Sequence, residues 1–169
     1  MITPPFQIDY LADHPTFIPE LARLHYAEWS ALRPGEPLEG REQRLRASCG
    51  HRSIPTVVVA FNRTTLLGSA MLTAHDMDTR IDLSPWLAGV FVAAEHRRKG
   101  IGSALVARIV EEARALGVSR LYLYTPKAEH LYARLGWSLV ERTTYREMEV
   151  AIMTLDLMSA VASSALCPC

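Results

Sequence analysis

The chain has 169 residues, of which 49% are hydrophobic, and its 18 basic and 18 acidic side chains give a formal net charge of zero. This length suits one domain with a sizeable core, and the apolar content excludes a disordered chain. A neutral chain does not suit a nucleic-acid binder, which should be basic. No signal peptide or long apolar run is visible, so we expect a cytoplasmic protein that does not contact membranes.

The first half of the chain predicts a strand, two helices and a hairpin. The long helix has Phe17, Leu21 and Leu24 on one face, with Pro19 in its first turn, where proline is tolerated. A valine-rich run before the turn at residues 62–64 and a returning strand after it predict the antiparallel hairpin. These elements are expected at residues 6–11, 16–32, 39–49, 55–61 and 65–74, and a polar loop follows at residues 75–84.

The second half opens with the apolar run 87–94, which is typical of a buried strand. The next segment carries Ile101, Leu105 and Ile109 at helical spacing and ends at Gly117. Further elements are expected at residues 120–125 (strand), 127–135 (helix), 137–144 (strand) and 149–157 (strand). The order β-α-α-β-β-β-α-β-α-β-β predicts an α/β fold with a mixed sheet.

The C-terminal residues 158–169 are small and weakly patterned, so we expect one domain at residues 1–157 followed by a tail. Three cysteines, Cys49, Cys167 and Cys169, do not make a disulfide framework. We regard the Cys167-Pro168-Cys169 string as incidental and predict no metal site.

A basic, glycine-bearing turn joins the apolar strand to the long helix that follows it, and reads Arg97-Arg98-Lys99-Gly100-Ile101-Gly102. A helix N-terminus has free N–H groups and a partial positive charge, so the turn suits a phosphate group. The Walker A pattern is missing from the chain. The dinucleotide pattern G-x-G-x-x-G fails at Leu105, and Arg120 stands where it needs an acidic residue, which disfavours a Rossmann-type oxidoreductase.

The same turn fits the pattern [RQ]-x-x-G-x-[GA] fully and resembles the pyrophosphate loop of the GCN5-related N-acetyltransferase (GNAT) family. The resemblance implies a single-domain GNAT-like fold, with a mixed, largely antiparallel sheet of six to seven strands flanked by about four helices. It implies acetyl-coenzyme A as cosubstrate, without a metal. The expected reaction is acetyl transfer to a primary amine, on a small molecule or a protein N-terminus, by direct attack in a ternary complex.

The resemblance also implies which residues bind the coenzyme. The backbone of Val90, Phe91 and Val92 would pair with pantetheine, and the N–H of Val90 or a neighbour would face the thioester oxygen. Thr125 and Lys127 would touch the coenzyme where the sheet opens. The pyrophosphate would be held by Arg97, Arg98, Lys99, Gly100, Ile101, Gly102 and Ser103.

A second signature follows at residues 131–137, which resembles F-Y-x-x-x-G-F and places Tyr132 near the coenzyme sulfur. A phenol there could protonate the thiolate leaving group. Some family members use a glutamate as general base at the start of the central strand, where this chain has Pro85-Trp86-Leu87. The nearby loop at residues 75–84 offers His75, with Asp76, Asp78 and Asp82 close to it in sequence. A water chain without a dedicated base is an equal alternative.

The acceptor is open at this stage. Glu36, Asp76, Asp78 and Asp82 could form an acidic rim for a cationic amine, whereas Arg80, Arg142 and Arg146 could meet an acidic peptide. Family members often form dimers through sheet edges or C-terminal strands, so a homodimer is possible through residues 150–157, although core packing explains that apolar run equally well. A catalytically silent acyl-coenzyme A sensor is the alternative function.

Overall fold

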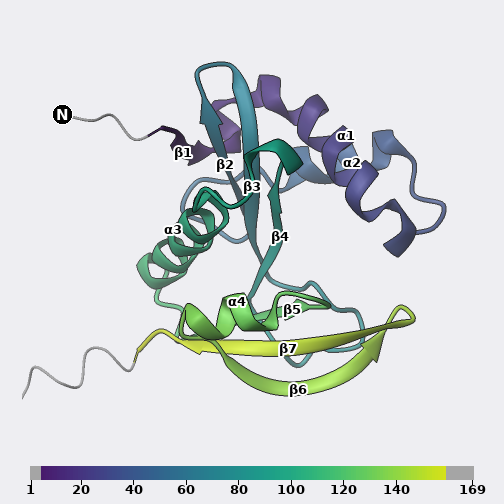
Figure 1. The fold of residues 1–169 in the computed structure, drawn as a ribbon, viewed down its shortest axis with the longest axis vertical. Coiled ribbons are helices and arrows are strands. Elements are labelled where there is room, and N and C mark those ends of the chain that lie inside the picture. The colour runs from purple at the N-terminus through teal and green to yellow at the C-terminus, as the bar shows by residue number, and fades with distance from the viewer. Residues whose placement is uncertain (1–4, 159–169) are drawn as a thin grey trace, which may run out of the picture.

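A computed structural model describes residues 5–158, which form one mixed seven-stranded sheet covered by helices on both faces (Figure 1). The strand order is β1-β2-β3-β4-β5-β7-β6. The strands are β1 (Gln7–Tyr10), β2 (Thr56–Asn62), β3 (Thr65–Thr73), β4 (Trp86–Val92), β5 (Arg120–Thr125), β6 (Ser138–Tyr145) and β7 (Met148–Asp156). The helices are α1 (Ile18–Trp29), α2 (Leu38–Ala47), α3 (Ile101–Ala115) and α4 (Glu129–Arg134).

The predicted fold class and element order are confirmed, and most predicted boundaries lie within two residues of the observed ones. The exception is the first long helix, which was expected at residues 16–32. Only Ile18–Trp29 is α-helical, and 3₁₀ turns at Pro15–Phe17 and Ser30–Leu32 flank it. The helix ends because Trp29 leaves the helical region, with φ −126° and ψ 9°.

The alternation of side chains along β2 explains why both faces of the sheet are covered. Val58 and Ala60 face a core cluster that contains Leu105 and Ile109 of α3. Val57, Val59 and Phe61 face the opposite cluster, which contains Leu21 of α1 and Leu45 of α2. The unbroken apolar run at residues 57–61 of β2 therefore reflects burial on both faces of the sheet.

The sheet opens between β4 and β5, its one parallel pair. The two strands share a single register pair, Trp86 with Tyr122, at the start of β4. Beyond this pair, β4 is paired only with β3, and β5 only with β7. The facing edges of the two strands therefore separate toward their C-terminal ends and form a wedge.

The loop between β3 and β4 is anchored to the core although its sequence is mostly polar. Met77 is 1% exposed and packs in a third core cluster with Trp86 and Ile152. The indole Nε1–H of Trp86 donates to the carbonyl of Leu83 at 2.8 Å. These contacts fix the loop beside the wedge.

Two predictions concern the C-terminal part of the chain. The apolar run 150–157 falls almost entirely in β7, an internal strand between β5 and β6 that supplies core residues, so the homodimer stays a prediction. The Cys167-Pro168-Cys169 tail lies outside the described residues. In the part of the chain that the structure describes, every helix is too short or too polar to cross a membrane.

Candidate active site

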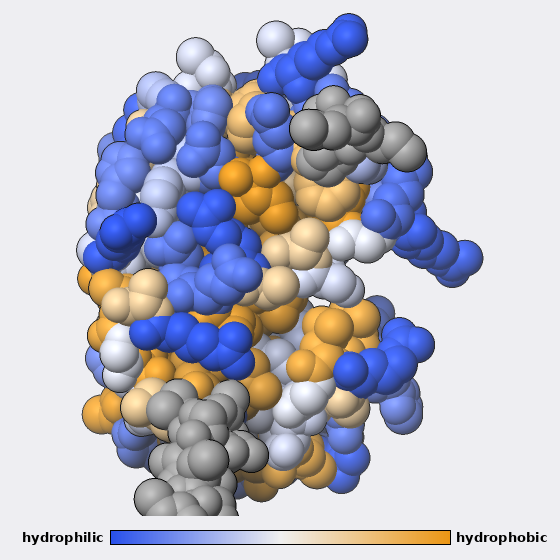
Figure 2. Space-filling view, turned by 90° about the vertical axis from the view of Figure 1, so that its left-hand side faces the viewer, coloured by the Kyte–Doolittle hydropathy of each residue, from blue (hydrophilic) through white to orange (hydrophobic). Residues whose placement is uncertain are grey.

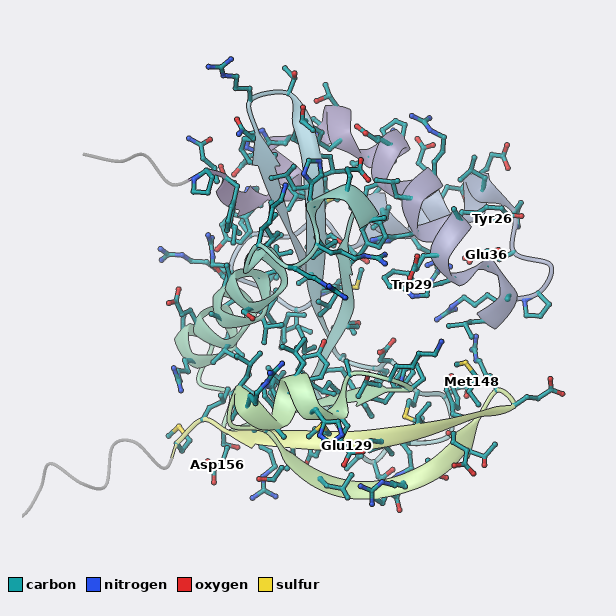
Figure 3. The ribbon with its side chains drawn as sticks, viewed as in Figure 1. Tyr26, Trp29, Glu36, Glu129, Met148 and Asp156 are labelled. Atoms are coloured by element: carbon teal, nitrogen blue, oxygen red, sulfur yellow. The ribbon has the colours of Figure 1, made fainter. Side chains whose placement is uncertain are left out.

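A cavity of about 580 Å³ lies where β4 and β5 separate. Figure 3 shows Trp29 of α1 and Met148 of β7 on its two sides, and the outline of the molecule is notched between its upper and lower parts in Figure 2. The lining comes from α1, α2, β4, β5, α4 and the β6–β7 turn, and includes His25, Trp29, Arg33, Arg41, Arg44, Asp76, Gly89, Val90, Tyr124, Thr125, Lys127, Tyr132 and Arg146.

The floor of the cavity is a bulge in β4. The register with β3 shifts between Ser69 and Met71, opposite Gly89, whose φ of +57° favours glycine. The hydroxyl of Ser69 donates to the carbonyl of Gly89 at 3.1 Å. The bulge re-aims the backbone of β4, including the N–H of Val90, at the point where the cavity begins.

His25 supports this bulge from α1. It is 3% exposed, and its Nε2 lies 2.8 Å from the Ser69 hydroxyl oxygen. Burial, with a smaller contribution from Arg41 and Arg44, lowers the pKa of His25 to about 3, so the ring is neutral at ordinary pH. Because the Ser69 hydroxyl donates its proton to Gly89, the ring donates Nε2–H to the hydroxyl oxygen.

The predicted pyrophosphate turn lies at the far end of β4, outside the cavity lining. Arg98 and Gly100 both have positive φ, +63° and +79°, and α3 begins at the next residue, Ile101. Arg97 folds back, donating from Nε to the carbonyl of Val92 at 2.9 Å and lying 3.7 Å from Glu28. No described atom lies within 4 Å of where a Cβ on Gly100 would sit, so the turn is open above the helix N-terminus.

Tyr132 of α4 is 7% exposed and reaches the cavity from the β5 side. Burial raises the pKa of Tyr132 to about 12, so the phenol keeps its proton at neutral pH. Trp137 packs against it with an inter-ring distance of 6.1 Å. The Thr125 hydroxyl accepts the Ala128 N–H at 2.9 Å, which holds the start of α4 against the end of β5.

His75, the predicted base, is exposed and does not line the cavity, but its neighbour Asp76 does. Asp76 is half-buried as a residue, yet its carboxyl group is surrounded by protein. This burial raises the pKa of Asp76 to about 6, although Arg33, Arg146 and Arg44 favour the charged form. Burial, followed by the charge of Asp76, also raises the pKa of Tyr124 on the facing strand.

The acidic and basic side chains proposed for the acceptor are largely engaged with each other. Glu36 pairs with Arg41 and Arg44, at 3.1 and 2.6 Å. Arg80 pairs with Asp82 at 3.0 Å, and Arg142 pairs with Glu129 at 2.6 Å; both pairs lie outside the cavity lining. An acidic rim is therefore not formed, and Asp76 remains as the acid at this end of the cavity.

The cavity brings together four of the predicted site residues: Val90, Thr125, Lys127 and Tyr132. The Phe91 side chain is instead buried against His25 and Trp29, which suits its predicted role through the backbone alone. The sequence analysis missed His25 and Tyr124. The only sequence signal for His25 was its position on the apolar face of a predicted helix, where a histidine usually packs in the core.

A split sheet, a cavity at the split and an open basic turn at the far end of the same strand define a site for an extended ligand with phosphate groups. The family model described as the acetyltransferase (GNAT) family matches residues 18–137. The chain belongs to this family and is an acetyltransferase that uses acetyl-coenzyme A. No curated protein matched the chain.

Several solved structures share the fold. The acetyltransferase of the GNAT family from Streptococcus pneumoniae is 20% identical with a TM-score of 0.67, covering 90% of this chain and 99% of that one. A putative acetyltransferase from Exiguobacterium is 24% identical with a TM-score of 0.64, covering 94% and 98%. The putative acetyltransferase yncA from Salmonella typhimurium, solved with its cofactor acetyl-CoA, is 18% identical with a TM-score of 0.65, covering 97% and 99%.

Proposed function

We propose that this acetyltransferase transfers the acetyl group of acetyl-coenzyme A to a primary amine by direct attack in a ternary complex. The observation that carries the proposal is the cavity at the wedge, which places the backbone of Val90, the phenol of Tyr132 and the carboxyl group of Asp76 around one space. β4 offers open strand backbone, α4 supplies a proton donor, and the loop between β3 and β4 supplies a proton acceptor.

The site offers suitable groups along the whole length of acetyl-coenzyme A, the acetyl donor. The turn from Arg98 to Ser103 is open and presents the N–H groups of the α3 N-terminus, which suits a pyrophosphate. The separated edge of β4 between Gly89 and Val92 offers backbone groups for pantetheine, as the yncA structure with acetyl-CoA makes reasonable for this fold. Thr125 and Lys127 border the same space from β5 and the segment after it.

Three groups of the protein would each assist one step of the acetyl transfer. The Val90 N–H would donate to the thioester oxygen as negative charge builds on it. Asp76 would take a proton from the attacking amine nitrogen as the nitrogen–carbon bond forms. Tyr132 would give its proton to sulfur as the carbon–sulfur bond breaks, because its raised pKa keeps that proton available.

Asp76 is the base we favour over His75 because it lines the cavity and its pKa of about 6 lies near physiological pH. A base with such a pKa is deprotonated at pH 7 and still accepts a proton effectively. His75 stays a prediction, with the water chain as the other alternative.

The first experiment is calorimetric titration with acetyl-coenzyme A, followed by an amine panel screened for release of free thiol. Tyr132→Phe should keep the affinity for acetyl-coenzyme A and lower kcat by roughly 10²–10⁴-fold, the usual contribution of a positioned proton donor. Tyr26→Phe, an exposed tyrosine of α1 outside the cavity lining, is the control and should behave as the wild type. Unchanged kcat in Tyr132→Phe would remove the phenol from the mechanism.

The turn has its own test. Gly100→Glu puts a side chain and a negative charge above the α3 N-terminus and should abolish acetyl-coenzyme A binding. Gly117→Glu is a matched control, since Gly117 also has positive φ (+75°) and open space, but at the other end of α3. Near-normal affinity in Gly100→Glu, or equal loss in both variants, would contradict the assignment of the turn.

A further inference from the structure

The acceptor end of the cavity is basic. Arg33, Arg41, Arg44 and Arg146 all line it, from the α1–α2 connection, α2 and the β6–β7 turn. Within residues 5–158, the acidic side chains in the same lining are Glu28 and Asp76. Glu36 pairs with Arg41 and Arg44, and Asp78 pairs with Arg146, both from outside the lining. Guanidinium groups therefore outnumber carboxylates on the cavity surface, which favours an acceptor that carries an anion.

Arg41 is the buried member of this group. It is 8% exposed, and its Nε and Nη2 atoms are buried without a hydrogen-bond partner among the described residues. Nη2 lies 3.1 Å from an oxygen of Glu36, but the pair lacks hydrogen-bond geometry. Burial and then the charge of Arg44 lower the pKa of Arg41, while the charge of Glu36 acts in the opposite direction.

Glu36 is already engaged by a second arginine. Arg44 donates to both of its carboxylate oxygens, at 2.6 and 2.9 Å. One carboxylate thus serves two guanidinium groups. A buried guanidinium with unused donors is costly, so its retention beside a substrate cavity points to a ligand that completes its hydrogen bonds.

The opposite wall contributes a further cation. Arg146 extends from the β6–β7 turn to the carbonyl of Leu32, where its Nη1 donates at 2.5 Å. This contact brings Arg146 beside the connection that carries Arg33. Arg33, Arg41 and Asp76 line the same cavity, so the cations and this acid border one space.

We propose that the acceptor is a small primary amine that also carries an anionic group, in the simplest case an amino acid. This inference rests on the proposed function. The anion binds Arg41 and Arg33, and the amine faces Asp76, so that both charges of a zwitterion meet their opposites. A planar guanidinium matches carboxylate and phosphate oxygens alike, so the amine carries either a carboxylate or a phosphate.

Matched acceptor pairs distinguish the possibilities. We would measure kcat/KM at saturating acetyl-coenzyme A for the common amino acids against their amides, for O-phosphoethanolamine against ethanolamine, and for spermidine. The anionic member of at least one pair should exceed its neutral partner by roughly 10- to 100-fold, as expected for one charge-assisted ion pair. Which pair shows the larger ratio identifies the carboxylate or the phosphate.

Three variants connect the preference to the arginines. Arg41→Met removes the charge and should erase the preference, and Glu36 is not left unpaired because it keeps two hydrogen bonds from Arg44. Arg33→Gln should reduce the preference and provides a second test. Arg46→Gln is the control, because Arg46 lies on the same helix, is half-exposed, pairs with Glu42 and is outside the lining.

Binding without turnover gives an independent readout. The anionic acceptor with the highest kcat/KM is titrated into the enzyme saturated with coenzyme A and followed by calorimetry. We expect binding that Arg41→Met loses and Arg46→Gln keeps. Equal or better kcat/KM for amides or spermidine, or an anion preference that survives in Arg41→Met and Arg33→Gln, would overturn the inference and leave the proposed acetyl transfer intact. Failure of the wild type to bind acetyl-coenzyme A would overturn both.

Discussion

His25 shows how one side chain of α1 shapes the backbone of a distant strand. Its ring, the Ser69 hydroxyl and the Gly89 carbonyl form a chain of two hydrogen bonds that ends at the bulge. The neighbouring N–H of Val90 is the group we propose to contact the thioester oxygen. His25 is therefore a positioning residue, and its neutral form is the one that the buried site tolerates.

The buried histidine predicts a pH dependence of stability. Its pKa falls from 6.5 in the unfolded chain to about 3 in the folded one, so below pH 6.5 the unfolded state binds the extra proton. This contribution is fully present above pH 6.5 and is lost as the pH falls toward 3, by roughly 1.4 kcal/mol per pH unit. Denaturant unfolding of the wild type and His25→Gln at pH 7, 6, 5 and 4 measures it.

The stability advantage of the wild type over His25→Gln should shrink as the pH falls. Gln43→Ala is the control, because Gln43 is exposed on α2 and does not titrate, so its difference from the wild type should be constant. A constant difference for His25→Gln would contradict the buried neutral ring. Comparison with a variant is needed because Asp76 acts in the opposite direction. Its pKa is raised in the folded state, so its contribution to stability is present below pH 3.8 and is lost as the pH rises through about 6.

Asp76 gives a second prediction, for catalysis. A general base acts only when it is deprotonated, so kcat/KM should fall about tenfold per pH unit below a pKa near 6. Asp76→Asn should lose this limb and lower kcat by roughly 10²–10⁴-fold, whereas Asp82→Asn, exposed on the same loop and outside the lining, should keep it. An unchanged acidic limb in Asp76→Asn would point to the water chain instead.

Among the elements, the β6–β7 hairpin has an unusual turn. Tyr145 pairs with Met148, so Arg146 and Glu147 form a two-residue loop, and both have positive φ, +49° and +65°. This is the geometry of a type I′ turn, which favours Asn-Gly. The strain is located where Arg146 extends over the cavity toward Leu32.

Glycine at the second turn position should relieve part of that strain. Glu147→Gly should raise stability by about 1 kcal/mol, which for a domain of this size raises Tm by roughly 2–4 °C. Glu149→Gly is the control, because Glu149 lies in the extended strand β7 and glycine there should destabilise. The Tm of both variants is measured by thermal unfolding, and a lower Tm for Glu147→Gly than for the wild type would mean that the turn is not strained.

At this scale the sequence predicted the elements well because their signals are local. The periodicity of residues 101–115, the valine run of the hairpin and the glycines that close helices each act within a few residues. The position of Asp76 depends instead on Met77, which is buried in a cluster with Tyr145 and Ile152, far along the chain. No local pattern distinguishes Asp76 from His75, so the choice between them needed the fold.

Across the whole molecule, the wedge explains why the site could be predicted only in part. The motif at residues 97–102 is contiguous, so its anion-binding character is visible in the sequence. The acceptor end is assembled from the α1–α2 connection, the loop before β4 and the β6–β7 turn, which are separated by tens of residues. Their charges compensate one another in pairs such as Arg44 with Glu36, and such pairing cannot be inferred from composition.

The wedge also predicts where the coenzyme protects the backbone. Beyond the pair of Trp86 with Tyr122, the facing edges of β4 and β5 lack strand partners within the described chain. Amide exchange at residues 89–92 and 123–125 should therefore slow when acetyl-coenzyme A is added. Residues 58–60 of β2, paired on both sides, should exchange slowly with or without it. Unchanged exchange at β4 would contradict binding along this edge.

The separation of the two ends of β4 has a consequence for how such a protein can diversify. The turn that we propose for the pyrophosphate lies a few residues beyond the end of the strand, whereas the arginines and Asp76 line the cavity with Gly89 and belong to segments that do not contribute to that turn. Substitutions that alter acceptor preference can thus accumulate in connecting loops without affecting the donor site. A duplicated copy of this gene could acquire a new acceptor through a few loop changes while every intermediate still used the same acetyl donor.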